Sequence, residues 1–154
     1  MRSSSYQLTW GSSVWAKVIA YNLYGNSQIS AAGNGAIILT SPDSPVSLAE
    51  KVSARSATSI SFTWSAGPTN GGAPVLDYRV SYDQANGTYV VLSTGITATS
   101  FTAINLVAGS TYAFKVEARN SYGYSVPSTA VSILCATIPS IPAAPTTLVI
   151  ANNL

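Results

Sequence analysis

Histidine is absent from this 154-residue chain, and cysteine occurs once. Without histidine, the chain lacks the residue most used as a general base and a common zinc ligand. The acidic residues are scattered rather than paired, as Asp43, Glu50, Asp77, Asp83 and Glu117. We therefore expect no catalytic residue, no metal site and no cofactor, and we interpret the chain as non-enzymatic.

Charge of either sign is also scarce. Charged residues make up 8% of the chain, whereas a typical soluble domain has about 25%. The net charge of +2 forms no basic patch, which argues against nucleic acid as a partner. Weak charge repulsion favours self-association, so we expect other copies of the chain or neighbouring repeats as partners, with glycans as a second class. The alternative is a neutral exterior rich in Ser and Thr.

Long hydrophobic runs are missing too. No apolar run approaches the roughly 18 residues that a membrane-spanning helix needs, so we expect no membrane insertion within this segment. The first six residues, Met1 to Tyr6, lack the apolar stretch of a secretory signal. We interpret position 1 as a cut into a longer protein, because the first of the repeats described next is incomplete.

An internal repeat organises the chain. Residues 8–27 match residues 106–125 at a shift of 98, with half of the twenty positions identical. The identical positions of the first copy are Leu8, Gly11, Ser12, Lys17, Val18, Ala20, Asn22, Tyr24, Gly25 and Ser27. A repeat of this quality indicates one folding unit used at least twice.

The central segment predicts short strands throughout. Tyr112, Phe114, Val116 and Ala118 alternate with polar or small residues, as expected of a strand with one buried face. Similar patterns occur near residues 48–52, 60–64, 78–82, 88–92, 100–102 and 131–135. The pair Asn86-Gly87 is the strongest hairpin signal. Strands every eight to twelve residues, separated by turn residues, indicate an all-β sandwich.

Two proline-rich segments mark the boundaries of the units. The segment from Thr40 to Pro45 has the spacing T-x-P-x-x-P, and the segment from Thr137 to Pro142 repeats it. We divide the chain into the end of one repeat (1–41), a complete domain (42–138), and a linker with the first strand of a next repeat (139–154). Proline at this density favours a stiff connection, so we expect a semi-rigid rod.

The whole pattern resembles the fibronectin type III family. The resemblance covers residues 45–137 as a whole domain, and 8–40 and 142–150 as partial copies. It is carried by Pro42, Pro45, Leu48, Trp64, Tyr78, Val80, Leu106, Tyr112, Phe114, Val116, Ala118, Asn120, Gly123 and Ser125. It implies an immunoglobulin-like sandwich of seven strands in two sheets without a disulfide. It also implies a structural corner, at which the Tyr112 hydroxyl bonds nearby backbone; Val14 occupies that place in the first copy.

The outward stripe of the first copy is the candidate surface for self-association. Trp15, Ile19 and Tyr21 occupy positions that are polar or small in the second copy, and an exposed apolar stripe often marks a contact surface. The alternatives are a register error of one residue, or cover from strands or linker not present here. Trp10 and Tyr24 are further candidates for an outward aromatic surface.

Four further positions have both a functional and a plainer interpretation. Asn86-Gly87-Thr88 is a glycosylation sequon, although Asn-Gly also serves the turn. Cys135 could cross-link chains, but we prefer a buried, small hydrophobic residue. Asp77 and Asp83 could pair with Arg79 or bind a cation, and we expect a solvated surface role instead.

Family membership alone does not assign a function. We favour a non-catalytic structural module of a tandem array that builds an extracellular or cell-surface filament, sheath or stalk by self-association. One alternative is the ectodomain of an adhesion protein or receptor, with residues 67–72 or 85–88 as its recognition loops. The other is a spacer beside a secreted enzyme domain.

Overall fold

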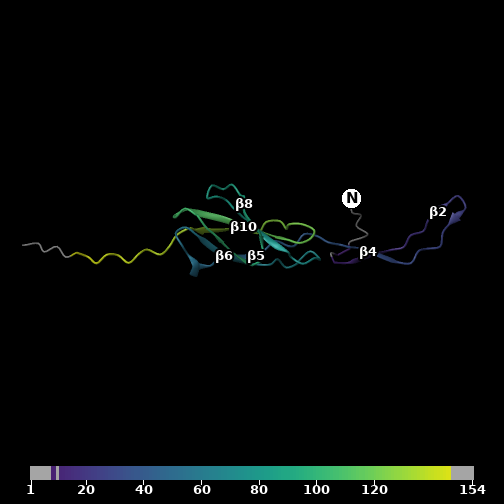
Figure 1. Ribbon diagram of the computed structural model, residues 1–154, viewed down its shortest axis with the longest axis horizontal. Helices are drawn as coiled ribbons and strands as arrows, with labels where there is room; N and C mark the ends of the chain where they lie inside the picture. Colours follow the sequence, from purple (N-terminus) through teal and green to yellow (C-terminus); the bar gives the residue numbers. More distant parts are fainter. Residues whose placement is uncertain (1–7, 10, 147–154) are drawn as a thin grey trace, which may run out of the picture.

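The computed structural model describes residues 8–9 and 11–146 of the chain, which form β-strands and one short 3-10 turn (Figure 1). In chain order the elements are β1 (Ser13–Ala16), β2 (Tyr21–Asn22), β3 (Gly25–Asn26), β4 (Gly33–Ile37), β5 (Val46–Glu50), η1 (Val52–Ala54), β6 (Ile60–Ser65), β7 (Asp77–Tyr82), β8 (Val90–Ile96), β9 (Ser100–Ala103), β10 (Thr111–Arg119) and β11 (Val131–Leu134). No helix among these described residues is long and apolar enough to span a membrane.

Strands β5 to β11 form a sandwich of two antiparallel sheets. One sheet has the order β11-β10-β7-β8 and the other the order β5-β6-β9. Strand β10 joins the first sheet through Phe114–Tyr82 and Arg119–Asp77 pairing with β7, while β6 lies at the centre of the second sheet. The all-β sandwich that the alternating pattern predicts is confirmed.

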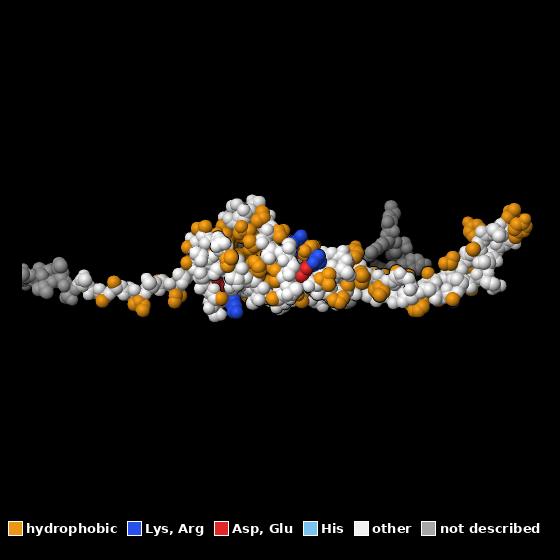
Figure 2. All heavy atoms as spheres, viewed as in Figure 1, with side chains coloured by type: hydrophobic (Ala, Val, Ile, Leu, Met, Phe, Trp, Pro, Cys, Tyr) orange, Lys and Arg blue, Asp and Glu red, His pale blue; other side chains and the backbone are white. Residues whose placement is uncertain are grey.

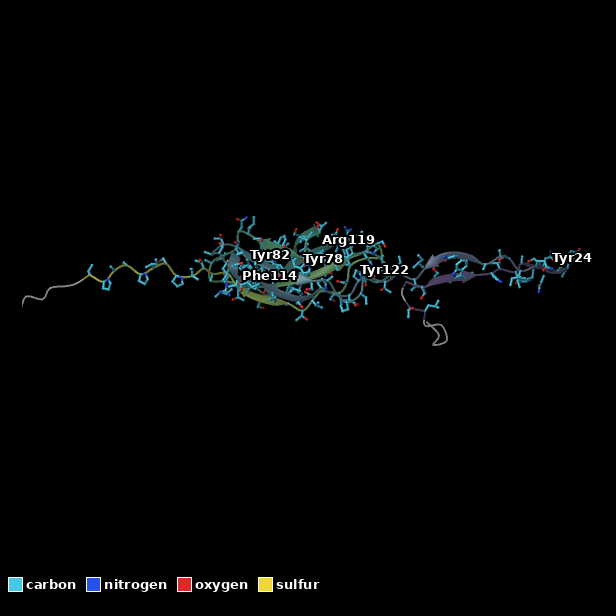
Figure 3. All side chains as sticks on the ribbon, turned by 90° about the horizontal axis from the view of Figure 1, so that it is seen from below. Tyr24, Tyr78, Tyr82, Phe114, Arg119 and Tyr122 are labelled. Atoms are coloured by element: carbon cyan, nitrogen blue, oxygen red, sulfur yellow. The ribbon has the colours of Figure 1, made fainter. Side chains whose placement is uncertain are left out.

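The core lies between β6 and β10. The side chains of Phe62 and Phe114 are fully buried, with ring centroids 4.7 Å apart. Tyr78, which Figure 3 labels within the sandwich beside Tyr82 and Phe114, receives the ring of Trp64 edge-on at a centroid distance of 5.4 Å. A strand exposes alternate side chains to one face, so the spacing of two in β10 delivers Phe114 and Val116 to this core together. Each fully buried side chain of this size contributes about 1.5–3 kcal/mol of burial free energy.

Some strand boundaries differ from those that the sequence predicts. Val52 begins the 3-10 turn rather than extending the first strand. The Asn86-Gly87 pair does not form a two-residue turn, because β7 ends at Tyr82 and β8 begins at Val90. Asp83 accounts for the wider loop: its carboxylate accepts the N–H groups of Ala85 and Ala113, and its carbonyl accepts that of Asn86.

Residues 11–38 form a long hairpin that projects from one end of the sandwich (Figure 1). Strand β1 pairs with β4, and β2 pairs with β3. The apolar run Ile37-Ile38-Leu39 predicts the last strand of this unit, but the strand observed there, β4, lies earlier and ends at Ile37. Val14, Ala16, Val18 and Ala20 take the places that Tyr112, Phe114, Val116 and Ala118 hold in the second copy, and the repeat therefore predicts that they face a core. Among the described residues nothing covers them, and Val18 is 67% exposed.

The chain leaves the opposite end of the sandwich as an extended tail (Figure 1). Residues 139–146 form no strand and are exposed. Residues 147–150, which complete the predicted first strand of a next repeat, lie outside the described residues.

Candidate functional site

Ionisable side chains form ion pairs rather than a reactive cluster. No group of three or more His, Cys, Asp or Glu residues that could hold a metal occurs in the part of the chain that the structure describes. Three arginines instead meet three carboxylates, in the pairs Arg55–Glu50, Arg79–Glu117 and Arg119–Asp77. The Arg55 guanidinium donates a hydrogen bond that lowers the pKa of Glu50, an exposed surface effect.

Two of these pairs lie side by side on the outer face of the four-stranded sheet. Arg79 stands directly opposite Glu117 and donates two bonds to its carboxylate, at 2.8 and 2.6 Å. Arg119 stands opposite Asp77 and also binds its carboxylate with two donors. The ring of Tyr124 lies 4.0 Å from the Arg79 guanidinium. Cross-strand pairs of opposite charge stabilise a sheet, so this cluster has a structural role.

The prediction of a solvated role for Asp77 is wrong. Asp77 is 7% exposed and Glu117 is 9% exposed, because the arginine side chains cover them. Asp77 pairs with Arg119 rather than with Arg79. Which partner each carboxylate meets depends on the register of β7 against β10, which the local sequence does not reveal.

Tyr112 occupies a corner at the start of β10. Its hydroxyl accepts a 3.0 Å hydrogen bond from the Val107 N–H, and its ring is 5% exposed. This bond fixes the loop before β10 against the strand itself, which holds the two sheets in place at that end.

The junction between the hairpin and the sandwich is the most elaborate polar site in the described chain, and Asn120 is at its centre. The Asn120 side chain donates to the carbonyl of Thr40 in the linker at 2.7 Å and to that of Asn70 at 2.8 Å. Its oxygen accepts the N–H groups of Tyr122 and Gly123. Asn120 is 2% exposed, so a single buried amide joins three segments: the linker, the 67–72 loop and the turn after β10.

The 67–72 loop packs directly on the linker. The Thr40 N–H donates to Gly71 at 2.9 Å, and the Asp43 N–H donates to Thr69 at 3.0 Å. A Cβ added at Gly71 would lie 2.2 Å from the Thr40 carbonyl oxygen, and one at Gly67 would lie 2.6 Å from that of Asp43. Only glycine permits backbone this close.

Further bonds hold the rest of the linker. The Asp43 carboxylate accepts from both the backbone N–H and the hydroxyl of Thr69, at 3.0 and 2.8 Å. The Ser44 hydroxyl donates to the Val126 carbonyl at 2.9 Å. Pro42 and Pro45 are both buried. The linker therefore packs against the sandwich rather than acting as a free tether. The 67–72 loop is bound to this linker, so it is not free to recognise a partner.

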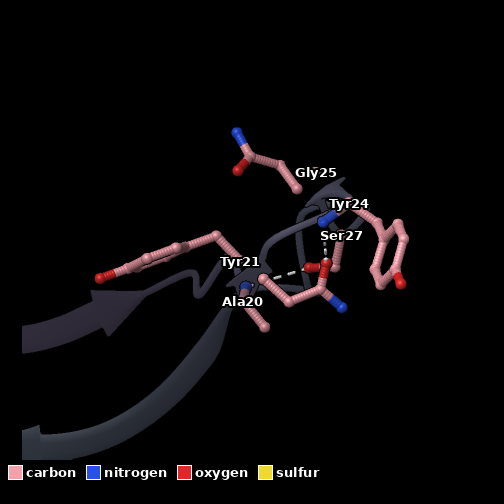
Figure 4. A pocket seen from close by; sticks show the side chains of 7 residues that line it. Ala20, Tyr21, Tyr24, Gly25 and Ser27 are labelled. Carbon is pink, nitrogen blue, oxygen red and sulfur yellow. Dashed lines mark hydrogen bonds between the residues drawn. The ribbon is translucent and has the colours of Figure 1, made fainter.

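The predicted self-association residues are all exposed on the hairpin. Trp15, Ile19 and Tyr21 have 64%, 49% and 85% of their surface exposed. Apolar atoms gather at the free end of the hairpin (Figure 2). At that end the rings of Tyr21 and Tyr24 extend away from each other (Figure 4). Two hydrogen bonds close the turn: the Ala20 N–H donates to the Ser27 hydroxyl oxygen, and the Tyr24 N–H donates to the Asn22 side-chain oxygen. Trp10 lies outside the described residues.

The remaining predicted residues lie apart from this junction. Asn86 is exposed in the 83–89 loop, and its side-chain oxygen accepts the Thr88 N–H at 2.8 Å. Cys135 is fully buried, and its thiol lies 3.3 Å from the Ala57 carbonyl oxygen. Burial raises the pKa of this thiol, which disfavours the reactive thiolate.

The role of Asn120 was not predicted from the sequence, where it is only one of the residues that carry the family resemblance. The sequence does contain a signal that could have drawn attention to Asn120. Asn22 stands at the equivalent position of the first copy, 98 residues earlier, and the proline-rich linker is repeated as well.

Comparison with known proteins places this geometry in a family. The fibronectin type III domain matches residues 44–133. Chitinase A1 of Niallia circulans is 33% identical over an alignment of 136 residues that covers 82% of this chain and 18% of that protein. This chain thus spans less than a fifth of that curated relative.

Solved structures share the fold. Domains A168–A170 of titin superpose with a TM-score of 0.63 at 24% identity, covering 81% of this chain and 41% of that one. The structure of a human fibronectin type III domain superposes with a TM-score of 0.59 at 20% identity, covering 75% of this chain and 96% of that one. The two-sheet sandwich, the Tyr112 corner and the match over residues 44–133 together make this chain a member of the fibronectin type III family.

Proposed function

We propose that the chain is a non-catalytic structural module of a tandem fibronectin type III array and acts as a stiff spacer. The observation that carries this proposal is the junction at Asn120, where a buried side chain bonds the linker of one unit to two loops of the next. A spacer needs a fixed angle between its units, and hydrogen bonds across a linker supply it.

The length of the chitinase match also supports a tandem arrangement. The alignment covers 82% of this chain, which is more than residues 44–133 alone supply, so the similarity extends beyond the matched domain. This relative favours a spacer beside a secreted enzyme domain as the setting of the array. The full reading frame tests that setting, because a glycosidase domain in it would support the idea and its absence would count against it.

The junction is tested by replacing Asn120 with Asp. The carboxylate keeps an acceptor for Tyr122 and Gly123 but loses the donors to Thr40 and Asn70. Each lost hydrogen bond costs about 0.5–1.5 kcal/mol, and the buried carboxylate would face two carbonyl oxygens, so we expect the linker to detach. Small-angle X-ray scattering should show a broader distribution of distances between hairpin and sandwich.

Asn22→Asp is the matched control. Asn22 accepts the Tyr24 N–H as Asn120 accepts that of Tyr122, but it is exposed. We expect this variant to scatter like the native chain. Unchanged scattering of folded Asn120→Asp would exclude the junction as the element that sets the angle.

We also propose that the outer face of the hairpin, formed by Trp15, Ile19 and Tyr21, binds other copies of the chain. Such contacts would build a filament, sheath or stalk outside the cell or on its surface. Trp15 and Tyr21 are large, exposed and nearly free of neighbouring charge, since Lys17 is the one charged residue between positions 8 and 39. Glycans at Asn86, which is exposed in the 83–89 loop of the sandwich, are a compatible modification. Glycosidase treatment that lowers the mass of natively sourced protein would support it.

Assembly is tested by sedimentation velocity across a range of concentrations. We expect the native chain to sediment faster as its concentration rises, and the double variant Trp15→Ser, Tyr21→Ser to sediment as a monomer. Tyr122→Ser removes a 67% exposed aromatic from the sandwich and should behave like the native chain. A native chain that remains monomeric throughout would contradict assembly by this face.

A further inference from the structure

The loop between β7 and β8 presents an Asn-Gly pair to solvent. Asn86 and Gly87 are both exposed in the turn of this loop. Asp83 anchors the loop ahead of the pair: its carboxylate accepts the Ala113 N–H at 2.9 Å, and its carbonyl accepts the Asn86 N–H at 3.0 Å. The pair therefore has a defined backbone path although it lies at the surface.

The Asn86 side chain folds back along the backbone that follows it. Its Oδ1 accepts the Thr88 N–H at 2.8 Å, and this bond closes a ring of atoms that includes Asn86 Cγ and the Gly87 nitrogen. An Asx turn of this kind mimics a backbone turn. The side-chain carbonyl carbon is therefore held close to the Gly87 nitrogen. The Thr88 N–H also polarises the carbonyl and is placed to stabilise negative charge on its oxygen.

The Gly87 nitrogen is open to reaction. No group in the described part of the chain accepts a hydrogen bond from it. Gly87 has φ of 84°, and no atom lies within 4 Å of the position that a Cβ would take. Glycine itself carries no side chain that would obstruct an approach to its nitrogen. An exposed N–H of this kind can give its proton to hydroxide, which leaves a nitrogen able to attack a carbonyl carbon.

We propose that Asn86 is a self-modifying residue, which converts to aspartate and isoaspartate in the folded chain. The Gly87 nitrogen gives up its proton to hydroxide and attacks Asn86 Cγ, so that a C–N bond forms. The Cγ–Nδ2 bond then breaks, and Nδ2 leaves as ammonia after taking a proton from water, which regenerates the hydroxide. Water adds to one of the two carbonyl carbons of the resulting succinimide. Opening at the main-chain carbon gives isoaspartate, and opening at Cγ gives aspartate.

The conversion changes both the charge and the chemistry of the loop. It replaces a neutral amide by a carboxylate, which lowers the net charge of +2 by one in a chain where only 8% of residues are charged. It also consumes the nitrogen that would carry a glycan, because Asn86-Gly87-Thr88 is a glycosylation sequon. A glycan on Nδ2 and the conversion of Asn86 therefore exclude each other.

A second Asn-Gly pair, Asn34-Gly35, is the matched control within the same chain. Both of its residues are exposed as well. Asn34, however, lies in β4 and pairs with Trp15 of β1. Closing the succinimide ring there requires Asn34 to leave the strand backbone, and opening a paired strand costs free energy. The same dipeptide should therefore react more slowly at this position.

The test incubates the bacterially produced chain, which carries no N-linked glycan, in mildly alkaline buffer. Ion-exchange chromatography follows the more acidic species, and peptide mapping by mass spectrometry measures aspartate and isoaspartate at each site. Circular dichroism reports that the sample stays folded, and a parallel sample in urea removes the fold. The variants Asn86→Gln and Asn34→Gln each remove one site, since glutamine would have to close a larger ring.

In the folded chain we expect Asn86 to convert at least about tenfold faster than Asn34, since only Asn34 must first leave a paired strand. In urea the two rates should become nearly equal. The main acidic species should be absent from Asn86→Gln and present in Asn34→Gln. Conversion of Asn86 no faster than that of Asn34 in the folded chain would overturn the proposal. A preference for Asn86 that persists in urea would also overturn it, because the neighbouring sequence and not the folded loop would then be its cause.

Discussion

Replacing Phe114 with alanine is expected to lower the free energy of unfolding of the sandwich by about 3–5 kcal/mol, the usual range for a buried phenylalanine. Phe114 is fully buried between the two sheets, 4.7 Å from the Phe62 ring and stacked at 6.5 Å on Tyr82. Its removal loses burial and leaves a cavity between strands that are fixed by pairing on both sides of β10. Urea unfolding followed by circular dichroism measures the change.

Tyr24→Ala is the control for Phe114→Ala. It also removes a large aromatic ring, but Tyr24 is 96% exposed at the free end of the hairpin. A surface change of this kind costs at most about 0.5 kcal/mol. Equal losses in the two variants would mean that Phe114 does not lie in a packed core, and the sandwich described above would be wrong.

The position of Phe114 could be predicted because it depends on a local pattern. Tyr112, Phe114 and Val116 alternate within one strand, and a period of two places all three on one face whatever lies opposite. The turn residues and the regular spacing of strands then gave the sandwich, and the family resemblance is confirmed by the match over residues 44–133.

What the sequence did not predict depends on contacts between distant segments. Asp77 looks like a surface acid until β7 and β10 are aligned and Arg119 covers it. Asn120 looks like a turn residue until the linker and the 67–72 loop meet it. The hairpin has the alternating apolar residues of a half-buried strand. Such alternation shows which side chains share a face of the strand, but it does not show whether another strand covers that face.

Replacing Gly71 with alanine should have the largest effect on the junction. Gly71 has φ of 71°, and an added Cβ would lie 2.2 Å from the Thr40 carbonyl oxygen and 2.6 Å from that of Ser41. Both obstacles are backbone atoms, so no side-chain rotation relieves them. We expect the linker to be displaced, with loss of the Thr40–Gly71 hydrogen bond and a fall of more than about 2 kcal/mol in the free energy of unfolding, since a positive φ alone costs alanine about 1–2 kcal/mol.

Gly109→Ala separates the two causes. Gly109 has φ of 78°, but no atom lies within 4 Å of the position its Cβ would take. This variant therefore incurs the conformational cost without the collision, and its small-angle scattering should match that of the native chain. Gly71→Ala can differ from Gly109→Ala in two ways: a larger loss of unfolding free energy, and a broader distribution of distances between hairpin and sandwich. If Gly71→Ala alone shows both, the close approach of the 67–72 loop to the linker sets the angle between hairpin and sandwich. Equal destabilisation with unchanged scattering would instead assign the whole effect of Gly71→Ala to its backbone conformation, and the packed linker would lose its role as the stiffening element.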